Sequence, residues 1–593
     1  MRRNRHIGVH LPESVPGRKD ALGTLLELCR TRASAEPDRK GFGFLGDGYE
    51  ESDALTLGEL DRIARAIAVT LRRQAHTARA RALLSYPPGL DFHVAFWGCL
   101  YAGLIPVPVA PLDGTRGNVK WTRVESIAGS SDARLFLSTR SALDAAEPVL
   151  AAADGLARLT RVATDEVCLD LAEQWTPPVA NGEMVAYLQY SSGSTGLPKG
   201  VAVTHANVLH NLSLIHDSTS RPADEAGLPR PPSVSWLPLH HNMGLISSVL
   251  DPLFSGRDVT LLPTMTFVQR PLTWLRAISA LGRADSCAPN FAFDLCVRRI
   301  TDVQRQDLDL SRWEMALVGG EPVRADTLSR FSEVFARTGF RRQALCPGYG
   351  LAESTVMVSA GPVGAGPVVL RLDAESLAAG TARIADGRRE SRELVGCGRI
   401  HRLSTVVAVD PSTGKPRGED EVGEILVSGP SVATGYWDAP GETAETFSAS
   451  LPDLPGERFL RTGDLGFLHD GQLFVTGRAK DVIIIAGANH YPQDIEATVE
   501  ACHPAVREMG ACAVAVDDGV RERLVVLVET TDPPTEEVKR EIRRAVHAKH
   551  RIQVHEVVLL EPGTLPLTTT GKLQRRNSRD RYLGGSFETA RLE

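Results

Sequence analysis

The stretch YSSGSTGLPKG, residues 190–200, directly follows an apolar run at residues 184–189 that is short enough to be a buried strand. It brings hydroxyl groups, glycines and a lysine together: Ser192, Gly193, Ser194, Thr195, Gly196 and Lys199. Small residues let backbone N–H groups approach phosphate oxygens, hydroxyls add donors, and the lysine adds positive charge. A Walker A loop would continue with Ser or Thr after the lysine, whereas Gly200 follows here. We interpret the stretch as a phosphate-binding loop; the alternative is a Ser/Gly-rich surface turn.

Short apolar runs and helical stretches alternate on both sides of this loop. Residues 24–33 and 56–74 have helical periodicity, and the second stretch opens at Thr56 with Glu59 three residues on, a capping-box pattern. The apolar runs are residues 82–86, 104–109, 134–138, 184–189, 259–262, 315–318 and 344–346. Such alternation predicts an α/β fold with mostly parallel, doubly wound sheets.

The pattern changes twice towards the C-terminus. Residues 361–394 have weak periodicity and a charged segment at 386–393, which we interpret as an insertion with a solvated face. Short strands between Gly and Pro turns predict a β-rich subdomain at 395–476. From residue 480 the pattern is that of a small α+β unit, with residues 482–485 as core. We therefore predict an N-terminal body at 1–479 and a mobile C-terminal domain at 480–593, hinged near Lys480 in the turn 477–481.

Composition restricts the function classes. The chain has 593 residues, 42% of them hydrophobic and 23% charged, which excludes a disordered or coiled-coil protein. Its 66 Lys and Arg are outnumbered by 73 Asp and Glu, and this acidic balance argues against nucleic-acid binding. The nine cysteines include no CxxC pair, so neither a disulfide framework nor a zinc or redox site is expected.

One uncharged stretch, residues 94–111, has the minimum length of a membrane span. Pro106, Pro108 and Pro111 interrupt it, so we predict a buried helix followed by a strand. The basic start of the chain lacks an apolar run behind it, so we expect no secretory signal. The protein is expected to be cytoplasmic, without integral membrane association.

The phosphate loop resembles that of the adenylate-forming superfamily, which comprises acyl-CoA synthetases, luciferases and peptide-synthetase adenylation domains. Five further motifs of the superfamily recur in order along residues 20–583. They are GGEP at 319–322, GYGLAEST at 348–355, RTGD at 461–464, GRAKD at 477–481 and TGK at 570–572. Singly each means little, but the ordered set is specific.

This resemblance implies roles for particular residues and implies ATP and Mg²⁺ as cofactors. The adenine would lie against Gly320, Glu321 and Pro322 and would stack on Tyr349 in the loop of Gly348, Gly350, Leu351 and Ala352. Asp464 and Arg478 would hold the ribose, and the phosphate loop with Lys199 would hold the β- and γ-phosphates. Thr195 and Glu353 would place Mg²⁺, and Lys572 would be the adenylating lysine. Locally, Lys572 alone reads as a solvated surface residue.

Within the superfamily the chain is most similar to the fatty acyl-AMP ligases. Two segments resemble the corresponding motifs of that subgroup: residues 236–246 (WLPLHHNMGLI) and residues 349–362. Residues 361–394 fall where those ligases carry an insertion. The subgroup usually reads His-Asp-Met-Gly, whereas this chain has Asn242 between His241 and Met243. The resemblance implies that the substrate binds at His241, Met243 and Gly244. A metal site at His240 and His241 is the less favoured interpretation.

The resemblance therefore implies ATP-dependent activation of a fatty acid to an acyl-adenylate, with release of pyrophosphate. The acyl group would pass to the phosphopantetheine thiol of a holo acyl carrier protein, expected as a separate chain because no Asp-Ser-Leu-type site follows. In such ligases the insertion restrains the C-terminal domain. The alternatives are an acyl-CoA synthetase, an adenylase of another carboxylic acid, and a non-catalytic acyl or nucleotide sensor. Cys346 is interpreted as a small core residue rather than a nucleophile.

Overall fold

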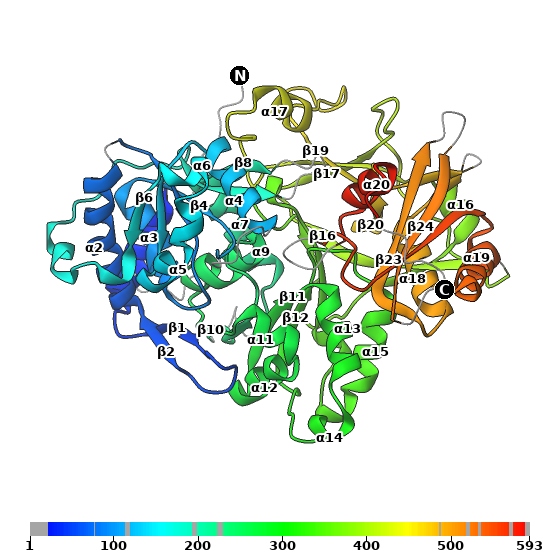
Figure 1. Ribbon diagram of the computed structural model, residues 1–593, viewed down its shortest axis with the longest axis horizontal. Helices are drawn as coiled ribbons and strands as arrows, with labels where there is room; N and C mark the ends of the chain where they lie inside the picture. Colours follow the sequence, from blue (N-terminus) through cyan, green and yellow to red (C-terminus); the bar gives the residue numbers. More distant parts are fainter. Residues whose placement is uncertain are drawn as a thin grey trace.

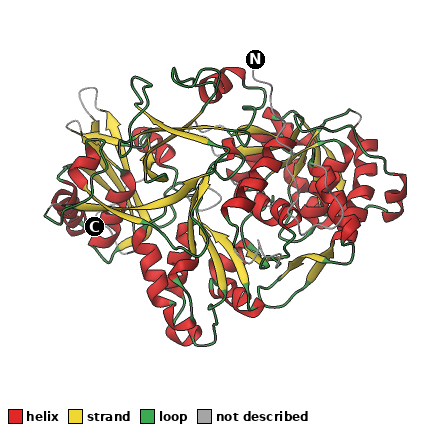
Figure 2. Cartoon of the chain, turned by 180° about the vertical axis from the view of Figure 1, so that it is seen from behind, coloured by secondary structure: helices red, strands yellow, loops and turns green. Residues whose placement is uncertain are grey.

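The mixed α/β architecture predicted from the sequence is confirmed by the fold. The computed structural model describes residues 22–75, 77–112, 119–191, 198–221, 229–388, 390–485, 488–517, 522–531, 535–567 and 573–587. Figure 1 shows the N-terminal part, in blue and cyan, at one end of the molecule and the C-terminal part, in orange and red, at the other. Seen from behind in Figure 2, helices surround the strands of the N-terminal part.

The first helices follow the sequence pattern. Helix α1 spans Leu25–Ala35 and helix α2 spans Leu57–Ala75. The capping box predicted at the start of α2 is present: Glu59 N donates to Thr56 Oγ1 (3.2 Å) and Thr56 N donates to the Glu59 carboxylate (2.9 Å). These bonds satisfy backbone donors that the first turn of a helix leaves unpaired.

The uncharged stretch at residues 94–111 is a buried helix followed by a strand, as predicted. Helix α3 (Asp91–Ala102) ends at Gly103, which adopts φ +77°, and strand β4 (Ile105–Pro108) follows. Strand β4 lies at the edge of its sheet, where proline does not interrupt a hydrogen-bond ladder. None of the helices that the structure describes is both long and apolar enough to cross a bilayer.

A small parallel sheet forms the end of the N-terminal part. Its order is β4-β3-β5-β6, and all neighbours are parallel. The remaining strands are β3 (Arg81–Leu84), β5 (Ala133–Ser138) and β6 (Thr160–Ala163). Next to it, the hairpin of β7 (Val185–Ser191) and β8 (Lys199–Thr204) pairs Ser191 with Lys199 and so brackets the glycine-rich segment.

A large sheet runs through the middle of the molecule, in the order β17-β18-β19-β20-β16-β14-β13-β12-β11-β9-β10-β1-β2. Its parallel half contains β1 (Lys40–Phe44), β10 (Val259–Leu261), β9 (Ser233–Ser235), β11 (Ala284–Ala288), β12 (Trp313–Val318) and β13 (Leu345–Tyr349), with β2 (Asp53–Thr56) antiparallel at the edge. Its antiparallel half contains β14 (Ser359–Ala360), β16 (Ser391–Ile400), β20 (Gln472–Arg478), β19 (Leu460–His469), β18 (Gly423–Ser428) and β17 (Thr405–Val409). The β-rich part therefore continues the parallel sheet through β14, a connection that the sequence pattern did not predict.

An aromatic core fixes β11 and β12 against the helices below them in Figure 1. The rings of Trp274 and Trp313 meet edge to face at 5.2 Å, and those of Phe293 and Phe331 at 5.0 Å. These side chains come from α12 (Leu272–Leu281), β12, α13 (Asn290–Arg299) and α15 (Ala325–Val334). Edge-to-face packing of this kind holds the strands rigidly.

Residues 361–394 contain strand β15 (Val369–Asp373) and helix α16 (Ala374–Ala378), and β15 pairs antiparallel with β16. Leu372 and Leu377 are buried in one cluster with Phe467 and Phe474, so the segment packs on the antiparallel half of the sheet. The prediction of a solvated face at 386–393 is wrong for Arg392. Only 15% of its side chain is exposed, because it contacts the C-terminal part.

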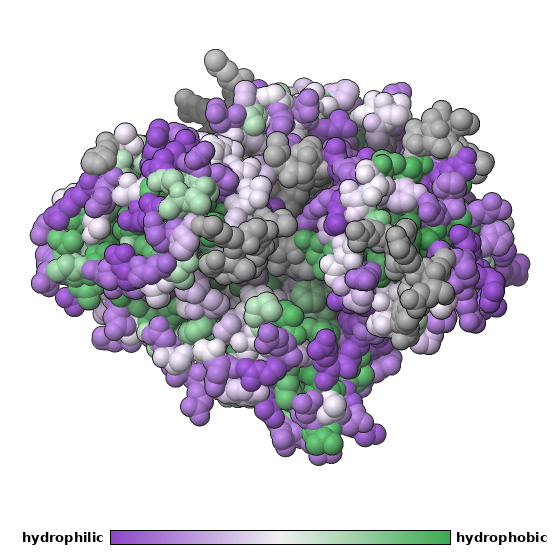
Figure 3. Space-filling view, in the orientation of Figure 1, coloured by the Kyte–Doolittle hydropathy of each residue, from purple (hydrophilic) through white to green (hydrophobic). Residues whose placement is uncertain are grey.

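The C-terminal part is a small α+β unit. Strands β23 (Val506–Asp517) and β24 (Glu522–Thr530) are antiparallel, and β25 (Val554–Leu560) lies parallel to β24. They are accompanied by α18 (Pro492–Cys502), α19 (Glu536–His550), α20 (Arg575–Leu583) and the hairpin of β21 (Ile483–Ile485) and β22 (Ala488–His490). Residues 482–485 are not uniformly core, since Ile483 is buried but Ile484 is 52% exposed. Figure 3 shows a hydrophilic surface over α19 at the edge of the molecule.

Candidate active site

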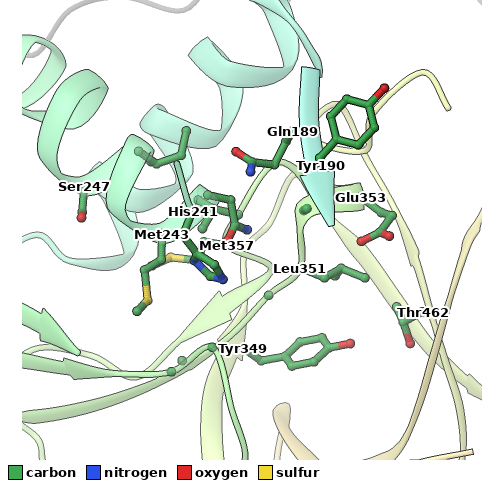
Figure 4. A pocket seen from close by; sticks show the side chains of 18 of the residues that line it. Gln189, Tyr190, His241, Met243, Ser247, Tyr349, Leu351, Glu353, Met357 and Thr462 are labelled. Carbon is green, nitrogen blue, oxygen red and sulfur yellow. The ribbon is translucent and has the colours of Figure 1, made fainter. Parts of the chain in front are cut away.

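A cavity of about 910 Å³ lies beside the carboxyl ends of β12 and β13. Gly320 follows β12, and Tyr349 and Glu353 lie at and after the end of β13; all three line the cavity. Figure 4 shows Tyr349, Leu351, Glu353 and Thr462 around one part of it, with Gln189 and Tyr190 from β7 nearby. Ligands of open α/β sheets bind outside the carboxyl ends of the parallel strands, which is where this cavity lies.

Tyr349, Asp464 and Arg478 form a connected polar group on the side of the antiparallel strands. Asp464 accepts a hydrogen bond from the Tyr349 hydroxyl (2.7 Å) and one from Arg478 Nε (3.1 Å). Asp464 is buried. Burial of Tyr349, together with the negative charge of the Asp464 carboxylate, raises the pKa of the Tyr349 hydroxyl well above its usual value. Tyr349 is thus a neutral donor, and its ring faces the cavity in Figure 4.

Glu353, Tyr436 and Lys199 form a second group. The Tyr436 hydroxyl donates to Glu353 Oε1 (3.0 Å), and burial with this carboxylate raises the pKa of Tyr436. Lys199 Nζ lies 5.1 Å from the centroid of the Tyr436 ring and 3.1 Å from a carboxylate oxygen of Glu442. One tyrosine therefore orients an acidic and a basic side chain that both line the cavity.

The loop after β13 is held in a constrained conformation. A Cβ at Gly350 would lie 1.7 Å from the carbonyl oxygen of Val356, so only glycine fits there. Thr355 adopts φ 64° and ψ −71°, the conformation at the centre of a strained γ-turn, and its Oγ1 donates to Ser431 O (2.8 Å). Strain of this kind persists only where the surroundings enforce it, and here it fixes the turn that carries Glu353.

The opposite side of the cavity is formed by the segment before and within α9 (Asn242–Leu245). His241 precedes the helix, and His241, Asn242 and Met243 line the cavity. Gln189 Nε2 donates to His240 O (3.0 Å), which joins this segment to the strand before the glycine-rich loop. In Figure 4, His241 and Met243 lie towards Met357 and Ser247, away from Glu353.

Comparison with known proteins agrees with this arrangement. A family model described as "AMP-binding enzyme" matches residues 29–437, and one described as "Disco-interacting protein 2-like, AMP domain" matches residues 480–591. The chain is 41% identical over 579 residues to the medium-chain-fatty-acid–[acyl-carrier-protein] ligase JamA of Moorena producens, covering 96% of this chain and 97% of JamA. It is 37% identical to the long-chain-fatty-acid–AMP ligase FadD26 of Mycobacterium tuberculosis, covering 95% and 97%. The chain belongs to the fatty acyl-AMP ligases.

The structural comparison gives the same family. The fatty acyl-adenylate ligase of Legionella pneumophila, solved with acyl adenylate and pyrophosphate, superposes with a TM-score of 0.74 at 36% identity, covering 94% of this chain and 96% of that one. The resemblance inferred from the sequence motifs is therefore confirmed. AMP-binding enzymes use ATP, so ATP is the nucleotide substrate of this ligase.

Most of the site residues predicted for the ligase lie around the cavity. The lining includes Lys199, Gly320, Gly348, Tyr349, Gly350, Leu351, Ala352, Glu353, Arg478, Lys480, His241 and Met243. Four others do not line it. Glu321 accepts a hydrogen bond from Phe291 N (2.6 Å) at the start of α13, and Pro322 is the next residue. Gly244 lies so close to the backbone of Pro238 that a Cβ there would be 2.2 Å from Pro238 O. Asp464 reaches the cavity only through Tyr349 and Arg478.

Two predicted groups lie outside the described residues: the loop Ser192, Gly193, Ser194, Thr195 and Gly196, and the lysine Lys572. Their roles stay predictions. The reading of Cys346 as a core residue agrees with its burial, which raises the pKa of its thiol to about 12. Its Sγ donates to Gly361 O (2.9 Å), and a buried thiol with a raised pKa is a poor nucleophile. Over the described part of the chain, no group of three acidic, His or Cys side chains could hold a metal ion.

Sequence reasoning missed Tyr436. It is 83 residues from Glu353 in the chain, and no spacing rule connects the two. Backbone hydrogen bonds bring them together: Ala433 N donates to Glu353 O (2.9 Å) and Trp437 N donates to Gly200 O (2.7 Å). The only sequence feature that could have pointed to Tyr436 is the Gly435-Tyr436 pair in a turn-rich segment. Two residues are too short a pattern to identify a site residue.

Proposed function

We propose that this ligase uses ATP to convert a fatty acid into its acyl-adenylate and passes the acyl group to the phosphopantetheine thiol of a separate acyl carrier protein. The observation that carries the proposal is the extent of the cavity. One continuous lining contains Tyr349 and Arg478 at one end and Met243, Met315 and Leu317 further in. A nucleotide and an apolar acyl chain can therefore meet within it. The relatives' names agree with both substrates.

Adenylation is an in-line reaction. A carboxylate oxygen of the fatty acid bonds to the α-phosphorus, the bond to the bridging oxygen breaks, and pyrophosphate leaves. Charge spreads over the phosphate oxygens, so positioning and electrostatic stabilisation suffice without a covalent nucleophile. We propose that Lys199 and the loop 192–196 hold the β- and γ-phosphates, and that Lys572 supplies positive charge at the bridging oxygen.

We propose that Mg²⁺ binds at Glu353, with Thr195 as a further ligand. Magnesium usually takes one or two carboxylates together with substrate phosphates and water, so a single glutamate in the cavity fits it. Tyr436 donates to one oxygen of Glu353, and the other oxygen would bind the ion. When bound, the metal would neutralise phosphate charge, and the ligase's own residues would orient the nucleotide around it.

The acceptor step requires the C-terminal domain to move. We propose that residues 1–479 form the adenylating body, that residues 480–593 turn about Lys480, and that the insertion at 361–394 restrains this rotation. Ala479, Lys480 and Asp481 line the cavity, so rotation there would change its wall. We also propose a cytoplasmic location, because all nine cysteines are free and seven of them are buried.

A panel of short, medium, long and aromatic acids tests the proposal. Pyrophosphate release should depend on ATP and a fatty acid, and acyl-adenylate should accumulate. Holo carrier protein should then remove the acyl group, whereas CoA should do so poorly. Efficient acyl-CoA synthesis would indicate a CoA ligase instead, and nucleotide binding without pyrophosphate release would indicate a sensor.

A further inference from the structure

The inner end of the cavity is polar. Beyond Met243 the lining includes apolar side chains, such as Ile215, Met315 and Leu317, that suit an alkyl chain. Polar residues also line it towards the amino ends of the parallel strands, where Ser233 and Met315 both pair with Asp285; they are Asp251, Arg257, Thr219, Ser233, Ser247 and Cys287. Figure 4 shows Met243, His241 and Met357 between Ser247 and the group of Tyr349 and Glu353. A methyl terminus at this inner end would face groups that prefer hydrogen-bonding partners.

Asp251 is the member of this inner wall with unused hydrogen-bonding capacity. The residue is 5% exposed and begins α10 (Asp251–Ser255). Its Oδ2 lies 3.3 Å from Arg257 Nε and 3.5 Å from Ser255 Oγ. Its Oδ1 is buried and has no hydrogen-bond partner among the residues that the structure describes. The terminal torsion of an aspartate is soft, so a small rotation can turn Oδ1 towards the cavity.

The carboxylate is held in place by a buried ion-pair network. Arg257 also binds Asp285 Oδ2 (3.1 Å), and Asp285, which is fully buried, binds Arg221 (2.5 Å). Burying several charges in this way rarely adds stability over apolar packing. It does keep a carboxylate acceptor at the inner end of the cavity, where recognition of a hydrogen-bond donor needs one.

We infer that the ligase selects a fatty acid with a hydroxyl group at or near its distal end, which donates a hydrogen bond to Asp251. The inference rests on the proposed function. A terminal carboxylate would be repelled by Asp251, and a terminal ammonium would lie beside the Arg257 guanidinium. A neutral donor avoids both penalties.

The sheet gives the length of chain that reaches this wall. Asp285 pairs with both Ser233 and Met315 in adjacent strands, so the inner residues lie at that level of the sheet. Gly319, at the nucleotide end, lies just past the end of β12 and four residues after Met315, about 13 Å at ~3.3 Å per residue. An extended alkyl chain advances ~1.25 Å per carbon, so about ten carbon atoms span the interval. We therefore expect medium-chain acids.

Matched acids test the inference. Straight-chain acids of about six to about twelve carbons are compared with their ω-hydroxy counterparts, using kcat/KM for acid-dependent pyrophosphate release. For chains that reach the inner wall, wild type should favour the hydroxylated acid about tenfold to a hundredfold, as expected where a buried acceptor is otherwise left unpaired. Shorter acids should show no such preference.

Two variants locate the effect. Asp251→Leu should abolish or invert the preference, measured as the ratio of kcat/KM for the hydroxylated acid to that for the plain acid of the same length. Asp258→Leu is the matched control, because Asp258 also pairs with an arginine (Arg39, 3.4 Å) but does not line the cavity. It should keep the preference.

The outcomes separate the two claims. If wild type adenylates plain acids as well as hydroxylated ones at every length, the inference fails and the proposed function stands. If no acid releases pyrophosphate from ATP, the proposed function itself fails. The wild-type comparison decides the inference even if Asp251→Leu does not fold.

Discussion

Replacing Arg392 with alanine should loosen the contact between the insertion and the C-terminal domain. Arg392 Nε lies 2.9 Å from Asp494 Oδ2, and its guanidinium lies 4.3 Å from the centroid of the Tyr491 ring. Tyr491 is buried, and Asp494 is 33% exposed. Both partners belong to the segment that begins α18, so we expect this side chain of the insertion to contribute to holding the C-terminal domain in this orientation.

The magnitude follows from the exposure of each partner. A partly exposed ion pair contributes about 1 kcal/mol after solvent screening. A cation over a buried aromatic ring contributes about 1 kcal/mol more. The sum, about 2 kcal/mol, corresponds to an increase of about thirtyfold in the population that leaves this orientation, at 1.4 kcal/mol per factor of ten. The contact of Gln493 Nε2 with Thr476 O (2.8 Å) and the Arg298–Glu508 ion pair would remain.

Fluorescence transfer between dyes on the two domains measures this population, and acyl-CoA output with added CoA measures its consequence. Arg392→Ala should raise both, without faster adenylation. Arg388→Ala is the control, because Arg388 belongs to the same charged segment but is exposed. Equal dye distances in the two variants, together with unchanged acyl-CoA output, would refute the reasoning.

Three further predictions concern the reaction site. Lys572→Ala should reduce adenylate formation by about 10²–10³ with ATP binding retained, and a rate within a few-fold of wild type would remove Lys572 from its proposed role. Asp464→Ala and Tyr349→Ala should raise KM for ATP more than they lower kcat, since nucleotide contacts exist before and during the reaction; steady-state kinetics showing only a kcat defect would contradict this. Tyr436→Phe removes a donor to the Glu353 carboxylate, a bond worth about 1.5 kcal/mol, so kcat/KM should fall about tenfold and the Mg²⁺ requirement should change. An unchanged Mg²⁺ titration would show that Tyr436 does not orient Glu353.

Local signals in the sequence predicted local structure well. The capping box at Thr56 and Glu59 is present, as predicted. The prolines at 106 and 108 correctly indicated a buried strand in an uncharged stretch that is long enough for a membrane span. The ordered motifs identified the family because each keeps its chemistry within a few residues. Two motif residues also serve neighbouring turns: Glu321 accepts a hydrogen bond from the first turn of α13, and Gly244 permits a close backbone approach. Their roles in binding stay predictions.

The parts of the site that the sequence could not predict depend on partners far apart in the chain. Tyr436 meets Glu353 because backbone hydrogen bonds tie its segment to Glu353 and to β8, and no local pattern records such bonds. Arg392 read as a solvated charge because its partners are about a hundred residues further on. Asp251 is likewise an acidic residue at a helix start, and only the fold shows that it is buried beside Arg257 and lines the cavity. Charge in a sequence carries no information on burial, and burial is the property from which we infer roles for Arg392 in domain position and for Asp251 in substrate choice.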